Sequence, residues 1–368
     1  MTPDTAAIRA EAEAAFAAFR AAGATPVETG ILQPAGTLLD LYGEDIRARA
    51  YVTHDPQLGE MMLRPDFTVP VVQTHMAHGA DPARYCYMGP VFRAQSTHAD
   101  RPREYLQTGF ELFDRSAPEL ADAEVFALFA DHLAPLPLTP VTGDIGILMA
   151  AVRGLDTTAR RRAALLRHIW RPARFRRLLD RFSGRAPQPP ERTALLDHLR
   201  AAPIPELIAA AGPLTGQRSA GEIATRAQAL LEDADTPPLK APEAALLYDL
   251  LTLTAPARAA LAHLTGITPL LPAIAPAVGR FAARLDALDA RGIDTATLPF
   301  EASHGRTAME YYDGFVFSFL APDAALPPVA SGGRYDALTA VLGGGQAIPA
   351  VGGVIRPALV AALRGQTC

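Results

Sequence analysis

The amino-acid sequence predicts an α+β protein whose mixed core is interrupted by a long helical segment. Short apolar runs separated by Pro, Gly and Asp fill residues 27–113, a texture typical of antiparallel strands joined by turns. Apolar residues then recur at helical intervals as far as about residue 291, after which strand-like segments return. Strands and helices do not alternate regularly, so a parallel dinucleotide-binding sheet is not expected.

Composition restricts the class of protein. The chain has 368 residues, which at ~150 residues per domain allows two or three domains or one domain with an insertion. A net charge of -5 argues against a main role in gripping nucleic acid. Neither an apolar run of ~20 residues nor a signal peptide is evident, so no membrane span is expected. Two cysteines, Cys86 and Cys368, favour a reducing cytoplasm over a disulfide framework.

Each expected element follows from a local pattern of apolar residues. Helical spacing predicts helices over residues 5–22, 69–78, 118–133, 192–201, 219–232, 242–264, 276–291 and 334–342, with another at the end of the chain. Short apolar runs predict strands over residues 51–53, 61–63, 85–88, 108–113, 141–147, 295–302, 312–320, 328–332 and 348–355. Pro172 is expected to divide two further helices within an arginine-dense run, residues 159–177, whose charged side chains form an outer face. RNA contact is the alternative for that run.

A first cluster of chemistry-bearing residues is the turn Leu63-Arg64-Pro65-Asp66-Phe67-Thr68. Asp66 and Thr68 lie two residues apart and are expected to point to one side, where they would hold an ammonium group by charge and hydrogen bonding. The alternative is structural, with Thr68 capping the following helix.

A second cluster occupies two strands joined by a loop that carries arginines. Arg93 ends the first strand, and Gln107 and Glu111 share one face of the second, with Gly109 between them. A glutamate flanked by Phe110 and Leu112 needs a partner if it faces inward. The alternative is that this face is solvated.

A third cluster is EYYDGFVF at 310–317, followed by SGGRYDAL at 331–338. Tyr311 and Tyr312 offer hydroxyl groups at the edge of an apolar pocket, although this cluster taken alone favours a β-hairpin with buried aromatic side chains. His75 and His78, three apart on a predicted helix, lack a third metal ligand, so no metal site is expected.

Taken in order, these segments resemble the catalytic domain of a class II aminoacyl-tRNA synthetase, and of histidyl-tRNA synthetase in particular. Pro34 stands where motif 1 has its proline, LRPDFT resembles the synthetase's LRPEGT, and YMGPVFR at 87–93 resembles motif 2. EYYDGFVF and SGGRYDAL resemble the two histidine-specific segments. The resemblance implies an antiparallel sheet flanked by helices over residues 1–368, a helical insertion at 156–275 and no anticodon-binding domain.

The resemblance also implies a histidine pocket. Asp66, Thr68 and Gln107 would hold the α-amino group, Glu111 and Tyr312 would face the imidazole with Tyr311 beside them, and Arg93 would contact the carboxylate. The implied histidine-binding set is Asp66, Thr68, Arg93, Gln107, Glu111, Tyr311 and Tyr312.

Departures from the synthetase pattern lie in the residues that activate histidine with ATP. Aligned on the tyrosines, Thr307 replaces an arginine, with Arg306 one residue early; Gln95 replaces an acid. Aligned on the sequence PAVG at 349–352, Leu359 takes the place of the motif 3 arginine, and Arg356 falls three residues short. Losing one such preorganised cation costs roughly 3–4 kcal/mol of transition-state stabilisation, so little adenylate formation is expected.

A histidine pocket without activation chemistry resembles the regulatory subunits of ATP phosphoribosyltransferase, which are paralogues of the synthetase. That resemblance implies a cytoplasmic, non-catalytic protein that needs no cofactor, binds neither tRNA nor membrane, and forms a homodimer within a hetero-octamer. It would be required by the short catalytic subunit in the first step of histidine biosynthesis and would sense histidine for feedback inhibition. The alternatives are a divergent histidine-activating enzyme and a scaffold with an empty pocket.

Overall fold

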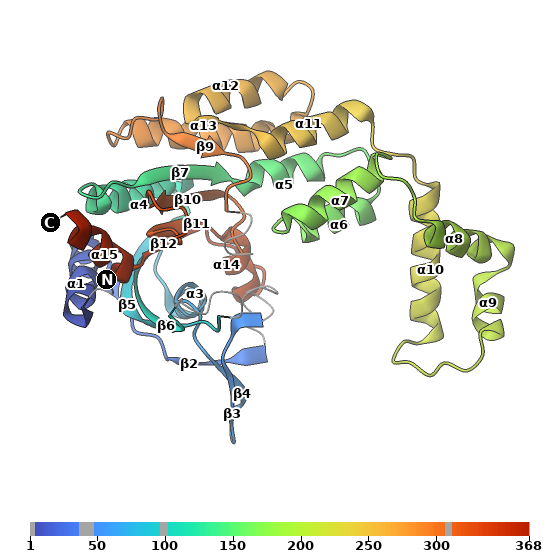
Figure 1. Ribbon diagram of the computed structural model, residues 1–368, viewed down its shortest axis with the longest axis horizontal. Coiled ribbons are helices and arrows are strands. Elements are labelled where there is room, and N and C mark those ends of the chain that lie inside the picture. The colour runs from blue at the N-terminus through green and yellow to red at the C-terminus, as the bar shows by residue number, and fades with distance from the viewer. Residues whose placement is uncertain (1–3, 37–47, 96–101, 306–310, 368) are drawn as a thin grey trace. The chain divides into compact units, whose positions relative to one another are not determined.

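The computed structural model describes residues 4–36, 48–95, 102–305 and 311–367 (Figure 1). The chain forms two compact units. The core unit comprises Met1–Ala150 and Leu250–Cys368, and the helical unit comprises Ala151–Asp249. In the described part of the chain, no helix combines the length and the apolar character needed to span a bilayer.

A largely antiparallel sheet forms the centre of the core unit. Its strand order is β1-β5-β6-β12-β11-β10-β7-β9-β8, with parallel pairing only of β1 to β5 and of β7 to β9 among the described strands. These strands are β1 (Thr25–Pro26), β5 (Ala83–Phe92), β6 (Glu104–Phe113), β7 (Thr139–Asp144), β8 (Thr254–Pro256), β9 (Pro299–Glu301), β10 (Phe315–Leu320), β11 (Ala330–Arg334) and β12 (Ala350–Ile355). A smaller sheet pairs β2 (Leu32–Pro34), β4 (Gly59–Leu63) and β3 (Val52–Asp55) in that order.

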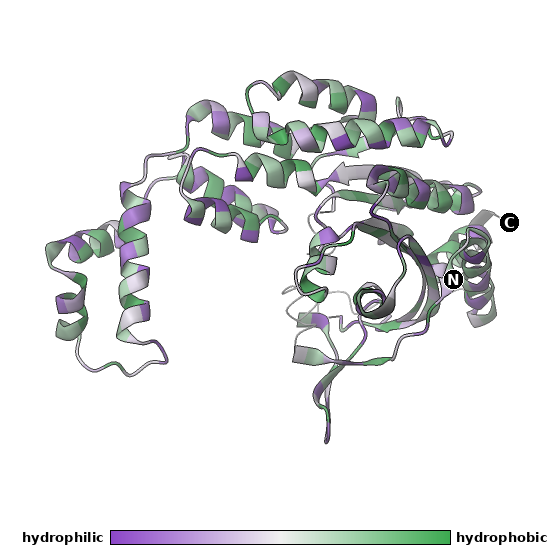
Figure 2. Ribbon diagram, turned by 180° about the vertical axis from the view of Figure 1, so that it is seen from behind, coloured by the Kyte–Doolittle hydropathy of each residue, from purple (hydrophilic) through white to green (hydrophobic). Residues whose placement is uncertain are grey.

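Helices cover both faces of the central sheet. On one face, Phe19 of α1 (Thr5–Ala21) packs between Phe110 of β6 and Phe129 of α4 (Pro118–Leu133). On the other face, α3 (Thr68–His78) lies within the curve of the sheet (Figure 2), and its His75 stacks on Phe113 of β6. The remaining helices of this unit are α12 (Ala257–Ile267), α13 (Ala275–Asp289), α14 (Asp336–Leu342) and α15 (Pro357–Thr367), with a short 3-10 turn at Pro272–Ile274.

The helical unit buries apolar side chains that recur at helical spacing. Leu165, Phe175, Leu179 and Phe182 are all buried, as the interleaving of apolar and arginine residues predicts. The helices of this unit are α6 (Ala159–Arg167), α7 (Pro172–Phe182), α8 (Pro190–Ala201), α9 (Ile204–Ala210) and α10 (Ala220–Asp235). Two helices, α5 (Ile145–Arg153) and α11 (Ala241–Thr252), cross the boundaries between the units.

Three expectations about elements are wrong. The strand expected at 141–147 ends at Asp144, and α5 begins at the next residue. The Asp144 carboxylate accepts a hydrogen bond from the Gly146 backbone N–H (2.9 Å) in the first turn of this helix. The helix expected at 242–264 is divided by β8, because Pro256 has no N–H to donate and holds the preceding residue extended. The helix α9 lies where no element was expected.

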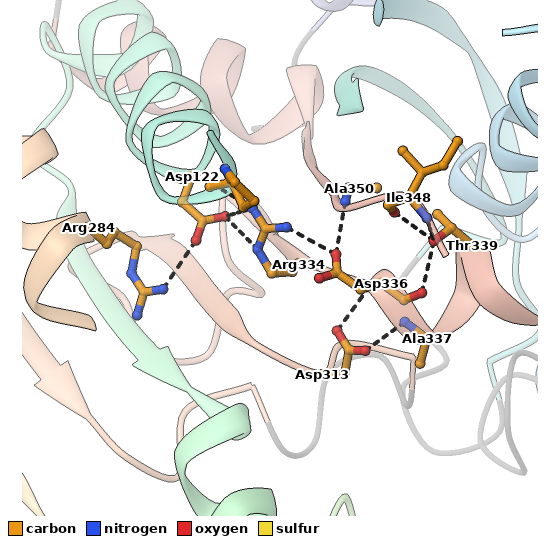
Figure 3. Close-up of polar contacts among 10 residues, drawn as sticks. Asp122, Arg284, Asp313, Arg334, Asp336, Ala337, Thr339, Ile348 and Ala350 are labelled. Carbon is orange, nitrogen blue, oxygen red and sulfur yellow. Dashed lines mark hydrogen bonds and ion pairs between the residues drawn. The ribbon is translucent and has the colours of Figure 1, made fainter. Parts of the chain in front are cut away.

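A chain of buried ion pairs links three elements of the core unit. Asp122 of α4 accepts from Arg284 of α13 (3.1 Å) and from Arg334 of β11 (2.7 Å) (Figure 3). Arg334 also donates to Asp336 (3.0 Å), and the Asp313 carboxylate accepts the first two backbone N–H groups of α14. Asp122 and Arg284 are 1% and 3% exposed, so each charge depends on its partner for the solvation that water no longer supplies.

We predict that Asp122→Asn destabilises the core unit by about 3 kcal/mol, since it removes the buried charge that Arg284 and Arg334 share and leaves each with one carboxylate, Asp144 (2.6 Å) and Asp336 (3.0 Å) respectively. Urea unfolding followed by far-ultraviolet circular dichroism measures this loss. Fluorescence of the single tryptophan, Trp170, reports the helical unit and serves as an internal reference. Asp131→Asn, on the exposed side of the same helix, should change stability by less than ~0.5 kcal/mol. Equal, small effects of both substitutions would contradict the assignment.

Candidate functional site

A cavity of about 450 Å³ opens in the core unit between the central sheet, the turn before α3 and the segment after residue 310. Six of the seven residues predicted for a histidine site line it; the exception is Glu111. Those six are Asp66, Thr68, Arg93, Gln107, Tyr311 and Tyr312. Residues from three separate stretches of sequence therefore meet at one place.

The turn before α3 presents one acid and one hydroxyl to this cavity. Arg64 anchors the turn by donating to the backbone carbonyls of Pro90 (2.9 Å) and Thr29 (2.6 Å). The helix begins at Thr68 with Phe67 in the capping position, so the alternative that Thr68 caps it is wrong. Instead the Thr68 hydroxyl donates to Glu111 (2.8 Å), and Asp66 accepts from the Tyr311 hydroxyl (3.3 Å).

Glu111 is fully buried beneath the cavity, which overturns the alternative of a solvated face. Its carboxylate accepts hydrogen bonds from the hydroxyls of Thr68 (2.8 Å), Tyr87 (2.9 Å) and Tyr335 (2.5 Å). Burial raises the pKa of Glu111 to about 7, although the three hydroxyl donors oppose that rise. The group therefore titrates near neutral pH.

Two glycines make room for this buried cluster. Gly109 lies opposite Tyr87 in the β5–β6 pair, and a Cβ there would lie 2.4 Å from the tyrosine hydroxyl oxygen. Gly352 lies opposite Glu111 in the β6–β12 pair, and a Cβ there would lie 1.5 Å from the carboxylate. Glycine is thus required at both positions for the side chain across the strand to fit.

Gln107 is the clearest sign that the cavity takes a polar ligand. Its side chain is fully buried and lines the cavity. Neither its amide nitrogen nor its amide oxygen has a hydrogen-bond partner among the described residues. A buried amide without partners costs about 1–3 kcal/mol per group, and a ligand that pairs with it recovers that cost.

Three arginines line the same cavity, and two of them have their guanidinium groups fixed by backbone carbonyls. Arg93 donates to Pro65 (2.8 Å), and Arg356 donates to Pro328 (2.5 Å). Arg49 is the third. With Asp66 nearby, the cavity presents both a carboxylate and guanidinium groups, a pattern that suits a zwitterionic ligand.

Tyr311 and Tyr312 remain protonated donors in this setting. Burial raises the pKa of both phenols, and the neighbouring carboxylates of Asp66 and Glu111 raise it further. Asp313 follows the two tyrosines, and its carboxylate ties this segment to the first turn of α14. Burial and the nearby Asp336 raise the pKa of Asp313 to about 7. The network of polar contacts in Figure 3 therefore ends at Asp313, the residue next to Tyr312, which lines the cavity.

Sequence reasoning missed part of this site. The sequence motifs contain Tyr87 and Tyr335 but do not single them out as partners of Glu111, although a glycine at position 109, opposite Tyr87, is a usable signal. Arg356 falls three residues short of the aligned motif 3 position and is therefore not predicted for the site, yet it lines the cavity. Arg306 and Thr307 lie outside the described residues.

His75, one of the two histidines considered as metal ligands, lies in the core of the unit. His75 is buried and stacks on Phe113, with its Nδ1 atom 3.2 Å from the Tyr85 hydroxyl. Among the described residues, no three His, Cys, Asp or Glu side chains gather as metal ligands would. His75 is accordingly part of the core packing.

The pKa of Glu111 makes stability depend on pH. Unfolding returns this pKa from about 7 to 4.5, so between those values the folded state binds more protons and its stability falls as pH rises. We predict that Glu111→Gln removes this dependence, and that the stability of the wild type relative to the variant drops by about 3 kcal/mol from pH 4.5 to 7. Urea unfolding across that range, with exposed Glu60→Gln as the control, measures it. Parallel curves for wild type and Glu111→Gln would contradict the raised pKa.

Comparisons with known proteins agree with this fold and with the resemblance in sequence. The chain is similar to a solved structure titled ATP phosphoribosyltransferase regulatory subunit/histidyl-tRNA synthetase from Bacillus halodurans, at 20% identity and a TM-score of 0.67, covering 97% of this chain and 79% of that one. It is also similar to histidyl-tRNA synthetase from Nostoc, at 16% identity and a TM-score of 0.64, covering 100% and 74%. These likenesses confirm the predicted class II synthetase fold, which is an α+β fold with a central sheet flanked by helices.

Curated relatives narrow the family. The ATP phosphoribosyltransferase regulatory subunit of Allorhizobium ampelinum is 32% identical over 358 residues, covering 91% of this chain and 92% of that protein. Its counterpart in Brucella anthropi is 33% identical over 346 residues, covering 89% of each. The histidyl-tRNA synthetase family model matches residues 1–255 and 204–358. The chain therefore belongs to the histidyl-tRNA synthetase-like family, among the ATP phosphoribosyltransferase regulatory subunits.

Proposed function

We propose that this chain is a non-catalytic regulatory subunit of ATP phosphoribosyltransferase whose core-unit cavity binds histidine. In this proposal the short catalytic subunit requires the chain for the first step of histidine biosynthesis, and histidine bound in the cavity inhibits that step. The observation that carries the ligand assignment is Gln107, a buried amide without partners in the described structure that lines a cavity with Asp66 and three arginines. The names of the curated relatives support the partner.

The cavity offers complementary groups for each part of histidine. Asp66, Thr68 and Gln107 would hold the α-ammonium group, because a carboxylate, a hydroxyl oxygen and an amide oxygen all accept hydrogen bonds. Arg93 and Arg356 would pair with the carboxylate. The imidazole would lie toward Glu111, Tyr311 and Tyr312, whose acid and phenols both donate and accept near neutral pH.

The assembly proposed with this role is a homodimer within a hetero-octamer that contains the short catalytic subunit, in the cytoplasm and without tRNA or a cofactor. We also propose that residues 156–275 form a helical insertion within the synthetase-like domain. A coupling free energy of only ~1–3 kcal/mol between histidine binding and catalysis would be enough for effective inhibition.

We predict that Gln107→Ala weakens histidine binding roughly tenfold or more, because the ammonium group loses a charge-assisted hydrogen bond. Titration calorimetry on the full chain measures the dissociation constant. Gln57→Ala, in an exposed turn between β3 and β4, is the matched control and should bind as the wild type does. No binding of millimolar histidine to the wild type would remove the sensor role and leave only a scaffold.

We further predict that mixing the purified chain with its short catalytic subunit produces phosphoribosyl-ATP formation, and that histidine suppresses it. Gln107→Ala should keep the activation but require roughly tenfold more histidine for inhibition, since the substitution affects only ligand binding. Activation with no response to histidine would refute the sensor, and no activation by the cognate chain would refute the regulatory role.

One observation favours a second candidate, a histidine-activating enzyme. Arg356 lines the cavity with Arg93 and Arg49, so cations are present even though the aligned motif 3 position holds Leu359. Activation requires these arginines to bind ATP phosphates beside histidine. Histidine-dependent exchange of pyrophosphate into ATP by the chain alone would establish this candidate and refute the non-catalytic role.

A further inference from the structure

The helical unit contains a second cavity, of about 350 Å³, that is unusually rich in arginine. Four helices contribute to it, and its charged lining consists of Arg160, Arg161, Arg181, Arg192, Arg226 and Asp233. The apolar remainder includes Phe182, whose ring lies 5.0 Å from the Arg161 guanidinium carbon and 4.6 Å from that of Arg181. The arginine-dense run noted in the sequence therefore turns some of its charges inward.

Asp233 is the only carboxylate among the cavity-lining residues, and three arginines already share it. Arg161 donates to one of its oxygens (2.7 Å), while Arg192 (2.7 Å) and Arg181 (3.6 Å) approach the other. One negative charge cannot neutralise three guanidinium groups. The cluster therefore carries a surplus of positive charge in a partly enclosed space.

The arginines at the rim have little further compensation. Arg160 lies 3.7 Å from Glu232, and both side chains are more than half exposed, so the pair is weak. Arg226 follows Glu222 by one turn of α10, and both side chains are exposed, so this charge interaction is weak as well. Burial and the nearby Arg192 and Arg161 lower the pKa of Arg181, as expected where cations crowd one another.

We propose that this cavity binds a phosphate-bearing anion of two or more charges, such as a diphosphate or a nucleoside polyphosphate. Guanidinium groups pair with phosphate oxygens in a planar, bidentate manner, and their arrangement from several helices around a compact hollow suits a small polyanion. A monocarboxylate would bring only one further negative charge to the one that Asp233 supplies, which would leave most of the positive charge of the five arginines uncompensated. A nucleic acid strand would need an extended basic track rather than an enclosed cluster.

Titration of the full chain with inorganic pyrophosphate tests this proposal. Saturable binding of one equivalent is expected, and Arg226→Gln should raise the dissociation constant about tenfold, since it removes a charge-assisted contact from an exposed side chain. Arg176→Gln, exposed on α7 and outside the cavity, carries the same charge change and should alter affinity less than about twofold.

Further arms identify the ligand and separate this site from the histidine cavity. Equal affinities for pyrophosphate and ATP would assign recognition to the phosphates, and tighter ATP binding would add a contact to the nucleoside; both support the site. Gln107→Ala should leave pyrophosphate binding intact, so this site stands or falls independently of the proposed function. Three results would each overturn the proposal. The first is the absence of saturable pyrophosphate binding, and the second is an equal loss of affinity in Arg226→Gln and Arg176→Gln. The third is binding of single-stranded RNA that pyrophosphate does not displace.

Discussion

The buried carboxylate of Asp122 is the interaction on which the core unit most depends. It faces two guanidinium groups, those of Arg284 in α13 and Arg334 in β11, which lie 50 residues apart in the chain. Removing water from three charges is costly, and only close pairing offsets that cost. Because Arg334 continues to Asp336, and the Asp313 carboxylate accepts the first two N–H groups of α14, the same pairing positions the segment that carries the cavity tyrosines. Stability and site geometry therefore share one electrostatic origin.

A second constraint concerns the acid beneath the cavity. Glu111 is held by three hydroxyls and fits only because β12 has a glycine opposite it. Those donors lower its pKa and burial raises it more strongly, leaving a group that titrates near neutral pH. A residue of this kind contributes little to stability above its pKa, so its value to the protein lies in the ligand chemistry proposed for it.

Sequence patterns predicted most elements of the core unit. They also indicated the candidate site residues, six of which the structure gathers around one cavity. Periodicity sufficed where a segment is amphipathic, as in α1 and α4. It failed between residues 241 and 267, where apolar residues keep a helical spacing on both sides of Pro256 and only that proline marks the division between the helices. Arg356 was missed for a different reason: alignment compares positions along the chain, whereas a long side chain reaches the cavity from a neighbouring position.

The proposed sensing role follows from how the buried acid is satisfied. Without a ligand, three protein hydroxyls meet the hydrogen-bonding needs of Glu111. In the proposed complex an imidazole N–H competes for the same carboxylate, so Thr68 or a tyrosine must find another partner or remain unpaired. An unpaired buried donor costs about 1–3 kcal/mol, which matches the coupling free energy typical of allosteric proteins. In this proposal a change at Thr68, the first residue of α3, would distinguish an occupied cavity from an empty one.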